Sequence, residues 1–229
     1  MKILGGLVTP SAGEILIDGN AVAIDSPRAA QDLGLGMVPD AFPTFPDPER
    51  TVAENIVMDM ESREWGAGID DAKARAVKII EAYHFSIDPD RPVRALAMNE
   101  KQQVQICRLL YRNAGIVMLD EPTAGLSKQE AAAFFRTLRA LALDGKSLLL
   151  ITHYLEEIKP FGDRVVVLRR GELAGIRDAK SADEDENFGM TLDGDDIAIC
   201  PPLAMDCNTV GVRHGAQAKP DATRPLDIG

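Results

Sequence analysis

The strongest constraint on the fold is an alternation of apolar strands with helical segments in the second half of the chain. The segments "GIVMLD" (115–120) and "SLLLITH" (147–153) are apolar almost throughout, and a helical pattern between them is opened by Ser127 and Glu130. Strands that are apolar on both faces are typical of a parallel sheet covered on both sides, and parallel strands need a crossover connection such as a helix. The sequence therefore predicts an α/β fold.

Capping residues mark where the helices begin and end. Thr51 with Glu54, and Ser127 with Glu130, have the spacing of capping boxes, and Gly145 is expected to be the C-cap of the second of these helices. Further helices are predicted from Ser26 and Pro27 and over residues 70–85 and 99–114.

The remaining strands lie at the two ends of this region. The segment "GEILIDGNAVAI" (13–24) alternates around Asp18-Gly19-Asn20 and predicts a hairpin at the sheet edge. The segments "GLGMVP" (34–39) and "RVVVLRRGELAG" (164–175) predict a buried strand and a strand followed by a turn. We expect an α/β core with an antiparallel β edge and a helical insertion.

The last part of the chain differs in composition. From about residue 178 the apolar periodicity stops, and the chain becomes acidic ("SADEDENFGMTLDGDD") and then rich in Pro, Ala and Gly. Segments of this kind bury too little apolar surface to fold alone. We expect residues 179–229 to form a poorly ordered tail.

Charge and cysteine content exclude several classes of protein. A net charge of -11 disfavours a partner such as duplex DNA, which is held through many phosphate contacts. The three cysteines form no CxxC pair, so neither a disulfide framework nor a zinc site is expected. No apolar run is long enough to predict a membrane span or a signal peptide.

An acidic pair ends the first apolar strand. In "IVMLDEPTAGL" (116–126) the strand runs into Asp120 and Glu121 and then into a proline turn, and His153 ends the next strand. Because ligands of open α/β sheets bind at the carboxyl ends of the strands, we expect these three residues at one edge. There the aspartate can hold Mg²⁺ through water, and the glutamate can polarise an attacking water. The alternative is a strand end whose acids only face solvent.

Several separated segments of the chain resemble segments of one protein family. They are "TVAENIVMD" (51–59), "VMLDEPTAGL" (117–126), "ITHYLEEI" (151–158) and "DRVVVLRRGELAG" (163–175). They look like segments of the ATPase subunits of ABC transporters, and "SPRAAQDLGLGMV" (26–38) is similar to the ribose, simple sugar and nucleoside importer group. The resemblance covers residues 1 to about 178. It implies a P-loop NTPase core of the RecA-like type, an antiparallel β edge and a helical subdomain at about 51–112.

The resemblance also implies a role for each matching residue. Asp120 corresponds to the Walker B carboxylate that holds Mg²⁺, Glu121 to the general base, and His153 to the switch histidine that contacts the γ-phosphate of ATP. Residues 124–127, which end at Ser127, correspond to the D-loop. The implied partners are transmembrane permease subunits, a second ATPase domain and, indirectly, a periplasmic substrate-binding protein, with no nucleic acid. The implied location is the cytoplasmic face of the cell membrane.

The phosphate-binding loop of this family is not found in the sequence. The motif G-x-x-x-x-G-K-[ST] is expected before a helix that resembles "MKILGGL", and this chain begins inside that helix. The segment "DGKS" (144–147) does not replace it, because Ala140 stands where the first glycine is required and a strand follows instead of a helix. We therefore expect an N-terminally truncated chain without the Walker A loop.

Two further positions depart from the family pattern. The signature, usually LSGGQ-like, aligns with "LAMNE" (96–100), where Ala97 lacks the hydroxyl, Asn99 replaces a glycine and Glu100 ends the motif. Asp40 stands where the family has a glutamine, and it would repel nucleotide phosphates if it were ionised and unpaired.

These features lead to one expectation and two alternatives. We expect an ATP-binding and ATP-hydrolysing subunit of an importer for simple sugars or nucleosides, impaired by the missing loop and the altered signature. The alternatives are a catalytically inactive partner of a complete ATPase, and a gene fragment.

Overall fold

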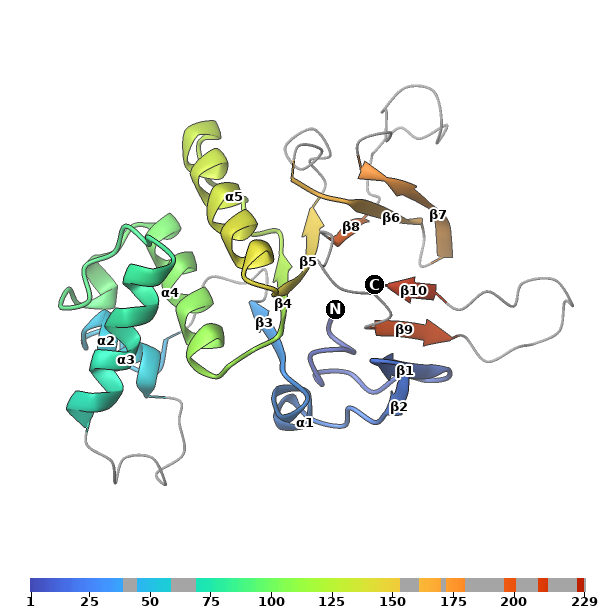
Figure 1. The fold of residues 1–229 in the computed structure, drawn as a ribbon, viewed down its shortest axis with the longest axis horizontal. Helices are drawn as coiled ribbons and strands as arrows, with labels where there is room; N and C mark the ends of the chain where they lie inside the picture. Colours follow the sequence, from blue (N-terminus) through green and yellow to red (C-terminus); the bar gives the residue numbers. More distant parts are fainter. Residues whose placement is uncertain are drawn as a thin grey trace, which may run out of the picture.

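The computed structural model describes residues 1–38, 45–58, 69–152, 161–169, 172–179, 196–200, 210–213 and 226–228 (Figure 1). The strands are β1 (Glu14–Ile17), β2 (Asn20–Val22), β3 (Leu35–Val38), β4 (Ile116–Asp120), β5 (Ser147–Thr152), β6 (Arg164–Arg169), β7 (Glu172–Asp178), β8 (Asp196–Cys200), β9 (Val210–Arg213) and β10 (Leu226–Ile228). The helices are α1 (Pro27–Asp32), α2 (Val52–Val57), α3 (Ile69–Ala82), the 3₁₀ turn η2 (Val93–Ala95), α4 (Met98–Tyr111) and α5 (Lys128–Leu143).

A six-stranded sheet forms the centre of the fold, with the strand order β3-β4-β5-β8-β6-β7. β3, β4 and β5 are parallel, and Met118 of β4 pairs with Met37 on one side and Leu149 on the other. The helix α5 connects β4 to β5, as the alternation of strand and helix signals predicts. The predicted α/β class is confirmed.

Each face of this sheet has its own core cluster. Val117 and Leu119 of β4 belong to the cluster that contains buried residues of α4 and α5, such as Cys107 and Leu141. Ile116 and Met118 belong to the other cluster, with Leu4, Ile15, Ile24, Ala30 and Leu35. Because successive side chains of a strand point to opposite faces, the continuous apolar run of β4 serves both clusters.

A smaller antiparallel sheet, in the order β10-β9-β1-β2, lies beside the first. β1 and β2 form the predicted hairpin, and Asp18 and Gly19 at its turn have φ values of 51° and 76°. Two successive positive φ values are the property of a type I′ turn, which matches the twist of the paired strands.

Three short strands are described in the C-terminal part of the chain, where the sequence predicts a poorly ordered tail. β8 pairs with β5 and β6 in the first sheet, while β9 and β10 extend the second sheet next to β1. Each of these strands is five residues or shorter, too short for the local sequence pattern to mark it. Pairing with strands that are distant in sequence places them. The predicted boundary at residue 178 stays a prediction.

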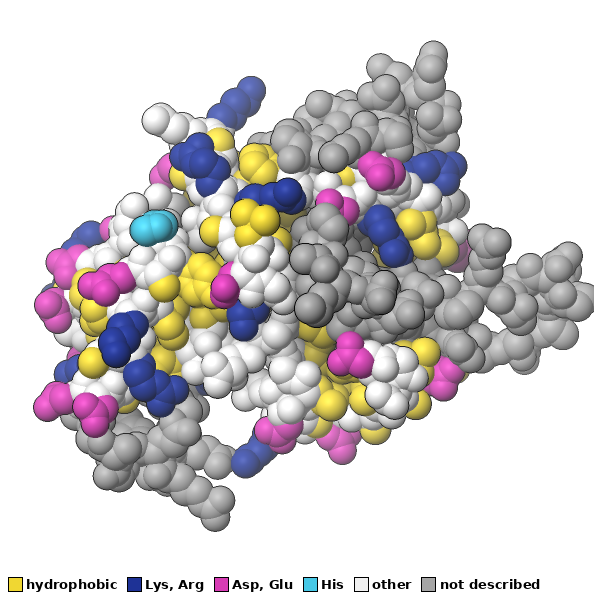
Figure 2. All heavy atoms as spheres, viewed as in Figure 1, with side chains coloured by type: hydrophobic (Ala, Val, Ile, Leu, Met, Phe, Trp, Pro, Cys, Tyr) yellow, Lys and Arg dark blue, Asp and Glu magenta, His cyan; other side chains and the backbone are white. Residues whose placement is uncertain are grey.

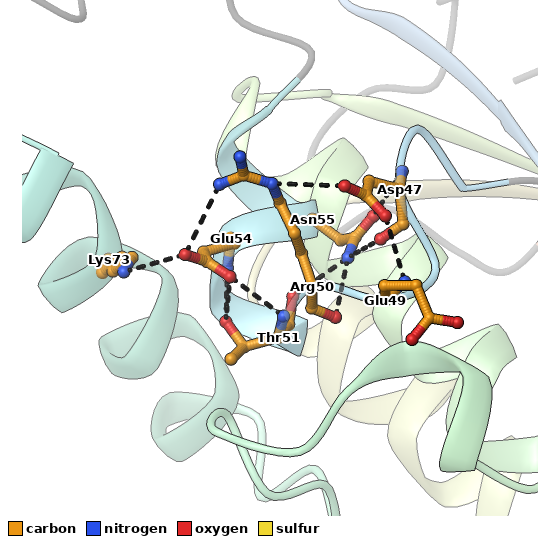
Figure 3. Close-up of polar contacts among 7 residues, drawn as sticks. All are labelled: Asp47, Glu49, Arg50, Thr51, Glu54, Asn55 and Lys73. Atoms are coloured by element: carbon orange, nitrogen blue, oxygen red, sulfur yellow. Dashed lines mark hydrogen bonds and ion pairs between the residues drawn. The ribbon is translucent and has the colours of Figure 1, made fainter.

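The helices α2, α3 and α4 pack together and form the helical part of the fold (Figure 1). Its first helix is held to the preceding loop by Asn55, whose side chain is fully buried. The amide nitrogen of Asn55 lies 2.8 to 3.2 Å from the carbonyl oxygens of Asp47, Arg50 and Thr51 (Figure 3). These contacts fix the loop that leads out of the segment containing Asp40, which itself lies outside the described residues.

Glu54 forms the predicted capping box with Thr51 and connects α2 to α3. Its carboxylate accepts hydrogen bonds from the backbone N–H of Thr51 at 3.0 Å and from the Thr51 hydroxyl at 3.1 Å, and Lys73 Nζ of α3 lies 3.2 Å away (Figure 3). The hydrogen bond from the Thr51 backbone, followed by the contact with Lys73, holds the pKa of Glu54 below its usual value.

We predict that Glu54→Gln lowers the free energy of unfolding at pH 7 by about 1 kcal/mol, because it weakens a helix cap and removes the charge that faces Lys73. Since the folded-state pKa lies below the unfolded one, the charged form stabilises the fold above the unfolded pKa. That contribution is lost as pH falls through the folded pKa. The difference between the two proteins in urea unfolding should therefore shrink from pH 7 to pH 3.

Glu49→Gln is the matched control, because Glu49 also contacts an arginine, Arg94 at 2.7 Å, but both side chains are exposed. Its effect should stay below about 0.5 kcal/mol. A Glu54→Gln effect no larger than that of Glu49→Gln would show that the capping box does not stabilise α2.

Candidate functional site

The acidic pair lies at the carboxyl end of β4, at the centre of the three parallel strands. Asp120 pairs with Ile151 of β5, and the backbone N–H of Glu121 donates to the Ile151 carbonyl at 2.9 Å. Both acidic side chains are half-buried. The predicted position of the pair at the sheet edge is therefore the observed one.

Glu121 has a left-handed backbone conformation, with a φ of 46°. This conformation costs a residue other than glycine about 1 kcal/mol or more, and it persists where surrounding contacts enforce it. Here the bond to Ile151 holds the residue on one side, and its carbonyl accepts from the N–H of Ala124 at 3.1 Å on the other. The strand thus ends abruptly, so that Asp120 continues the strand direction while Glu121 turns out of it.

The segment that follows the acidic pair is a tight turn into α5. The N–H of Leu126 donates to the Thr123 carbonyl at 3.0 Å, and Gly125 has a φ of 82°. Ser127 is exposed and is the N-cap of α5, with its hydroxyl 2.7 Å from Glu130 Oε2. These hydrogen bonds from Ser127 lower the pKa of Glu130. In this structure the predicted cofactor-binding residue Ser127 has a capping role.

The signature-like segment forms the N-terminus of α4. Ala97 is the N-cap residue, and its N–H donates to Glu100 Oε2 at 2.7 Å. The alanine side chain has no oxygen to accept the N–H of Glu100 in return, so only half of a capping box is present. The segment therefore keeps the backbone geometry of a helix start, without the hydroxyl that would complete the cap.

Asn99 occupies the second position of α4 and is half-buried. Its side-chain oxygen is buried and has no hydrogen-bond partner among the residues that the structure describes. The N–H groups of a helix N-terminus favour anions, and a glycine here would leave their approach open. Asn99 has a side chain at this position.

Arg91 is a residue that the sequence analysis missed. One of its guanidinium nitrogens lies 2.9 Å from Glu100 Oε1, and the other donates to the Ala95 carbonyl at 2.6 Å. It thus ties the 3₁₀ turn η2 to the first turn of α4. No local pattern reveals this role, because Arg91 lies nine residues before Glu100 and outside any helix.

The topology places the acidic pair at the end of β4 and the signature-like segment at the start of α4 at the same end of the fold. α4 runs toward the connection at residues 112–115, and β4 returns from it, so the start of α4 and the end of β4 point the same way (Figure 1). The predicted residues Asp40 and His153 follow β3 and β5, the two neighbours of β4, but both lie outside the described residues.

The chemistry of the acidic pair fits a magnesium ion. Mg²⁺ prefers oxygen ligands, keeps several waters, and is usually held by one or two carboxylates together with phosphates. Asp120 presents such a carboxylate, half-buried, at the end of a central strand. Within the described ranges no group of three or more His, Cys, Asp or Glu comes together, so these residues would supply only part of the ligand set.

The visible face of the helical part carries charges of both signs (Figure 2). Acidic and basic side chains are interspersed over the visible face of the helical part, and they form no continuous basic surface there among the described residues (Figure 2). None of the helices in the described ranges is long and apolar enough to cross a membrane.

Curated relatives of the chain are import proteins. It is 40% identical over 174 residues to the nucleoside import ATP-binding protein NupA of Lactococcus lactis subsp. cremoris, across 75% of this chain and 34% of that protein. It is 33% identical over 229 residues to the ribose import ATP-binding protein RbsA of Rhodopirellula baltica, across 99% of this chain and 44% of that protein. The chain thus spans less than half the length of these curated relatives.

Comparison with solved structures identifies the fold. A nucleotide-free ATP-binding cassette from an ABC transporter superposes with a TM-score of 0.67 at 23% identity, over 77% of this chain and 74% of that one. This likeness identifies the P-loop NTPase fold of the ABC ATPase cassettes, as the sequence predicts. The sequence model of the family described as "ABC transporter" matches residues 1–124, which is more than half of the 229 residues. The protein therefore belongs to the ABC transporter family of ATP-binding cassettes.

Proposed function

We propose that the chain acts as the ATP-binding and ATP-hydrolysing component of an importer for simple sugars or nucleosides. The observation that carries this proposal is the end of β4, where Asp120 and Glu121 stand in the middle of a parallel sheet with a fixed, left-handed turn between them and α5. The names of the relatives, which are import ATP-binding proteins for nucleosides and ribose, support the substrate class.

Each residue has a distinct role in this proposal. Asp120 holds Mg²⁺, and Glu121 accepts a proton from the attacking water. When bound, Mg²⁺ would neutralise charge on the phosphates of ATP. The left-handed backbone of Glu121 directs its carboxylate away from the path of the strand, so that the metal ligand and the base occupy different places. His153, Asp40 and Ser127 stay predicted contacts of the nucleotide.

We propose that ATP hydrolysis is slower than at a site with the usual signature. The start of α4 offers backbone N–H groups to an anion. Ala97 lacks the hydroxyl of the usual signature, and Asn99 adds a side chain where that signature has a glycine. The 229 residues contain no G-x-x-x-x-G-K-[ST] motif. The proposal therefore assigns to them only the roles of metal ligand, general base and signature segment.

The partners follow from the same proposal. They are transmembrane permease subunits, a second ATPase domain and, through the permease, a periplasmic substrate-binding protein, which places the chain at the cytoplasmic face of the membrane. Residues 1–178 would form the cassette, with the helical subdomain at about 51–112. An inactive partner of a complete ATPase is the second candidate, but such a partner needs a competent signature, and Ala97 and Asn99 disfavour it.

We predict that Glu121→Gln lowers ATP hydrolysis by about 10²- to 10⁴-fold and leaves Mg-ATP binding intact, because it removes the general base and no phosphate contact. The protein to measure is the full chain joined at Met1 to a designed segment that carries a G-x-x-x-x-G-K-[ST] loop, in steady-state phosphate release. Glu172→Gln is the control, since Glu172 is an exposed acid on β7. Equal rates for Glu121→Gln and the unsubstituted protein would mean that the acidic pair has no catalytic role.

We predict that Ala97→Ser has two separable effects. The added hydroxyl should complete the capping box with Glu100 and raise the free energy of unfolding by about 0.5–1 kcal/mol. Together with Asn99→Gly it should also increase phosphate release by the joined protein, because the start of α4 becomes more accessible to phosphate. Thermal unfolding checks the first effect and phosphate release the second. The signature interpretation is wrong if stability rises but the double variant turns over no faster.

A further inference from the structure

A cavity of about 500 Å³ lies between the helices α1 and α4 and the strand β3, which stands at one end of the described strand order (Figure 1). Pro27 and Ala30 line it from α1, Leu109 lines it from α4, and Leu35 and Met37 line it from β3. A cavity of this size, with mostly apolar walls and a few polar groups, is typical of sites that bind small molecules.

Two arginines bring positive charge to this cavity. Arg108 lies in the last turn of α4, and Arg112 is the C-cap residue of that helix. Both line the cavity, and residues four positions apart on a helix lie on the same face. No acidic side chain is found among the lining residues that the structure describes. The cavity therefore combines two positive charges with mostly apolar walls.

Neighbouring side chains hold Arg108 in place. Its Nη1 donates to Gln105 Oε1 at 2.9 Å, and its guanidinium carbon lies 5.9 Å from the centre of the Phe45 ring. Gln105 and Phe45 also line the cavity. A guanidinium that is already held by such contacts loses less side-chain freedom when it binds a ligand. Arg108 is thus preorganised to bind a ligand.

The surroundings of the two arginines disfavour their charges. Burial lowers the pKa of Arg108 to about 10, and the nearby charge of Arg112 contributes to that shift. Burial also lowers the pKa of Arg112. The C-terminal end of α4 favours cations and offsets part of this cost. An anion between the two guanidinium groups would offset more of it, because opposite charges attract more strongly in a partly desolvated site than in water.

The two arginines lie far from the candidate nucleotide site. Asn99 is in the first turn of α4, whereas Arg112 follows its last turn, and the rise of a helix separates them by roughly 20 Å along the axis. Asp120 ends β4, whereas the C-terminal end of α4 leads to the beginning of that strand. The net charge of -11 gives anions no general attraction to the chain. Binding of an anion would therefore depend on this local pair of arginines.

We propose that this cavity is a binding site for a small organic anion, a carboxylate or phosphate ester with a compact apolar body. The anionic head lies between Arg108 and Arg112, and the apolar body lies against Leu35, Met37 and Leu109. Planar guanidinium groups match the oxygens of a carboxylate or phosphate, and apolar walls favour a ligand that brings carbon as well as charge. This site goes beyond the proposed function, because it requires neither the acidic pair nor a nucleotide.

The first experiment titrates the chain of 229 residues with benzoate. Benzamide is the uncharged compound of similar shape, and inorganic phosphate has charge without an apolar body. In calorimetry we expect benzoate to bind about tenfold more tightly than either compound. In NMR it should shift the Nε–H signals of both Arg108 and Arg112. An absence of benzoate binding, or an affinity no higher than that of benzamide or phosphate, would overturn the proposal.

The second experiment asks which residues hold the anion. Arg108→Gln should weaken benzoate binding about tenfold or more, because it removes charge-assisted hydrogen bonds. Arg139→Gln is the matched control, since Arg139 is an exposed arginine of α5 and its loss changes the net charge equally. The control should bind benzoate as the unsubstituted chain does. Equal losses of affinity in the two variants would overturn the proposal. Arg112→Gln replaces Arg108→Gln if thermal unfolding shows that the latter does not fold.

A third variant tests the apolar walls without changing the charge. Leu109→Phe keeps both arginines and fills part of the cavity, so it should weaken benzoate binding several-fold and leave phosphate binding unchanged. Benzoate affinity that Leu109→Phe does not alter would contradict the placement of the apolar body. The candidate nucleotide site would be unaffected by that result, because Leu109 lies in the last turns of α4, away from the acidic pair.

Discussion

The pairing of β4 with β3 and β5 is the interaction on which the rest of the structure depends. Val117 and Met118 in its centre have no exposed surface and face opposite core clusters. Burial of side chains of this size contributes about 1.5–3 kcal/mol each. The residues from Ile116 to Leu119 also pair with a strand on each side. Because one strand serves both clusters, the helices α4 and α5 on one face and the N-terminal segment on the other are positioned relative to it.

The candidate site follows from that placement. Asp120 stands at the end of β4, where pairing with Ile151 of β5 fixes its backbone. The left-handed Glu121 is held by β5 through its hydrogen bond to Ile151. Sites built on strands are more rigid than sites on loops. The signature-like segment depends on a second framework, in which Arg91 and Glu100 connect η2 to α4. The two frameworks are joined by the connection between α4 and β4.

Prediction from sequence succeeded where the signal is local. The capping boxes at Thr51 and Ser127 and the hairpin turn at Asp18 each depend on residues within a few positions, and the structure has them where they were predicted. The apolar strand before Asp120 was also predicted from its local sequence. β8 was not predicted, because a strand of five residues is too short for its sequence alone to mark it. The contact of Arg91 with Glu100 was also missed, because it joins residues on two separate elements.

The sequence by itself determined the α/β class, the order of strands and helices as far as β6, and the presence of two carboxylates at the end of a buried strand, because apolar periodicity and capping act over short stretches of chain. Only the tertiary structure decided the left-handed turn at Glu121 and the position of β8 between β5 and β6. These features depend on contacts between residues distant in the chain, and their free energy comes from pairing and burial that no local segment contains.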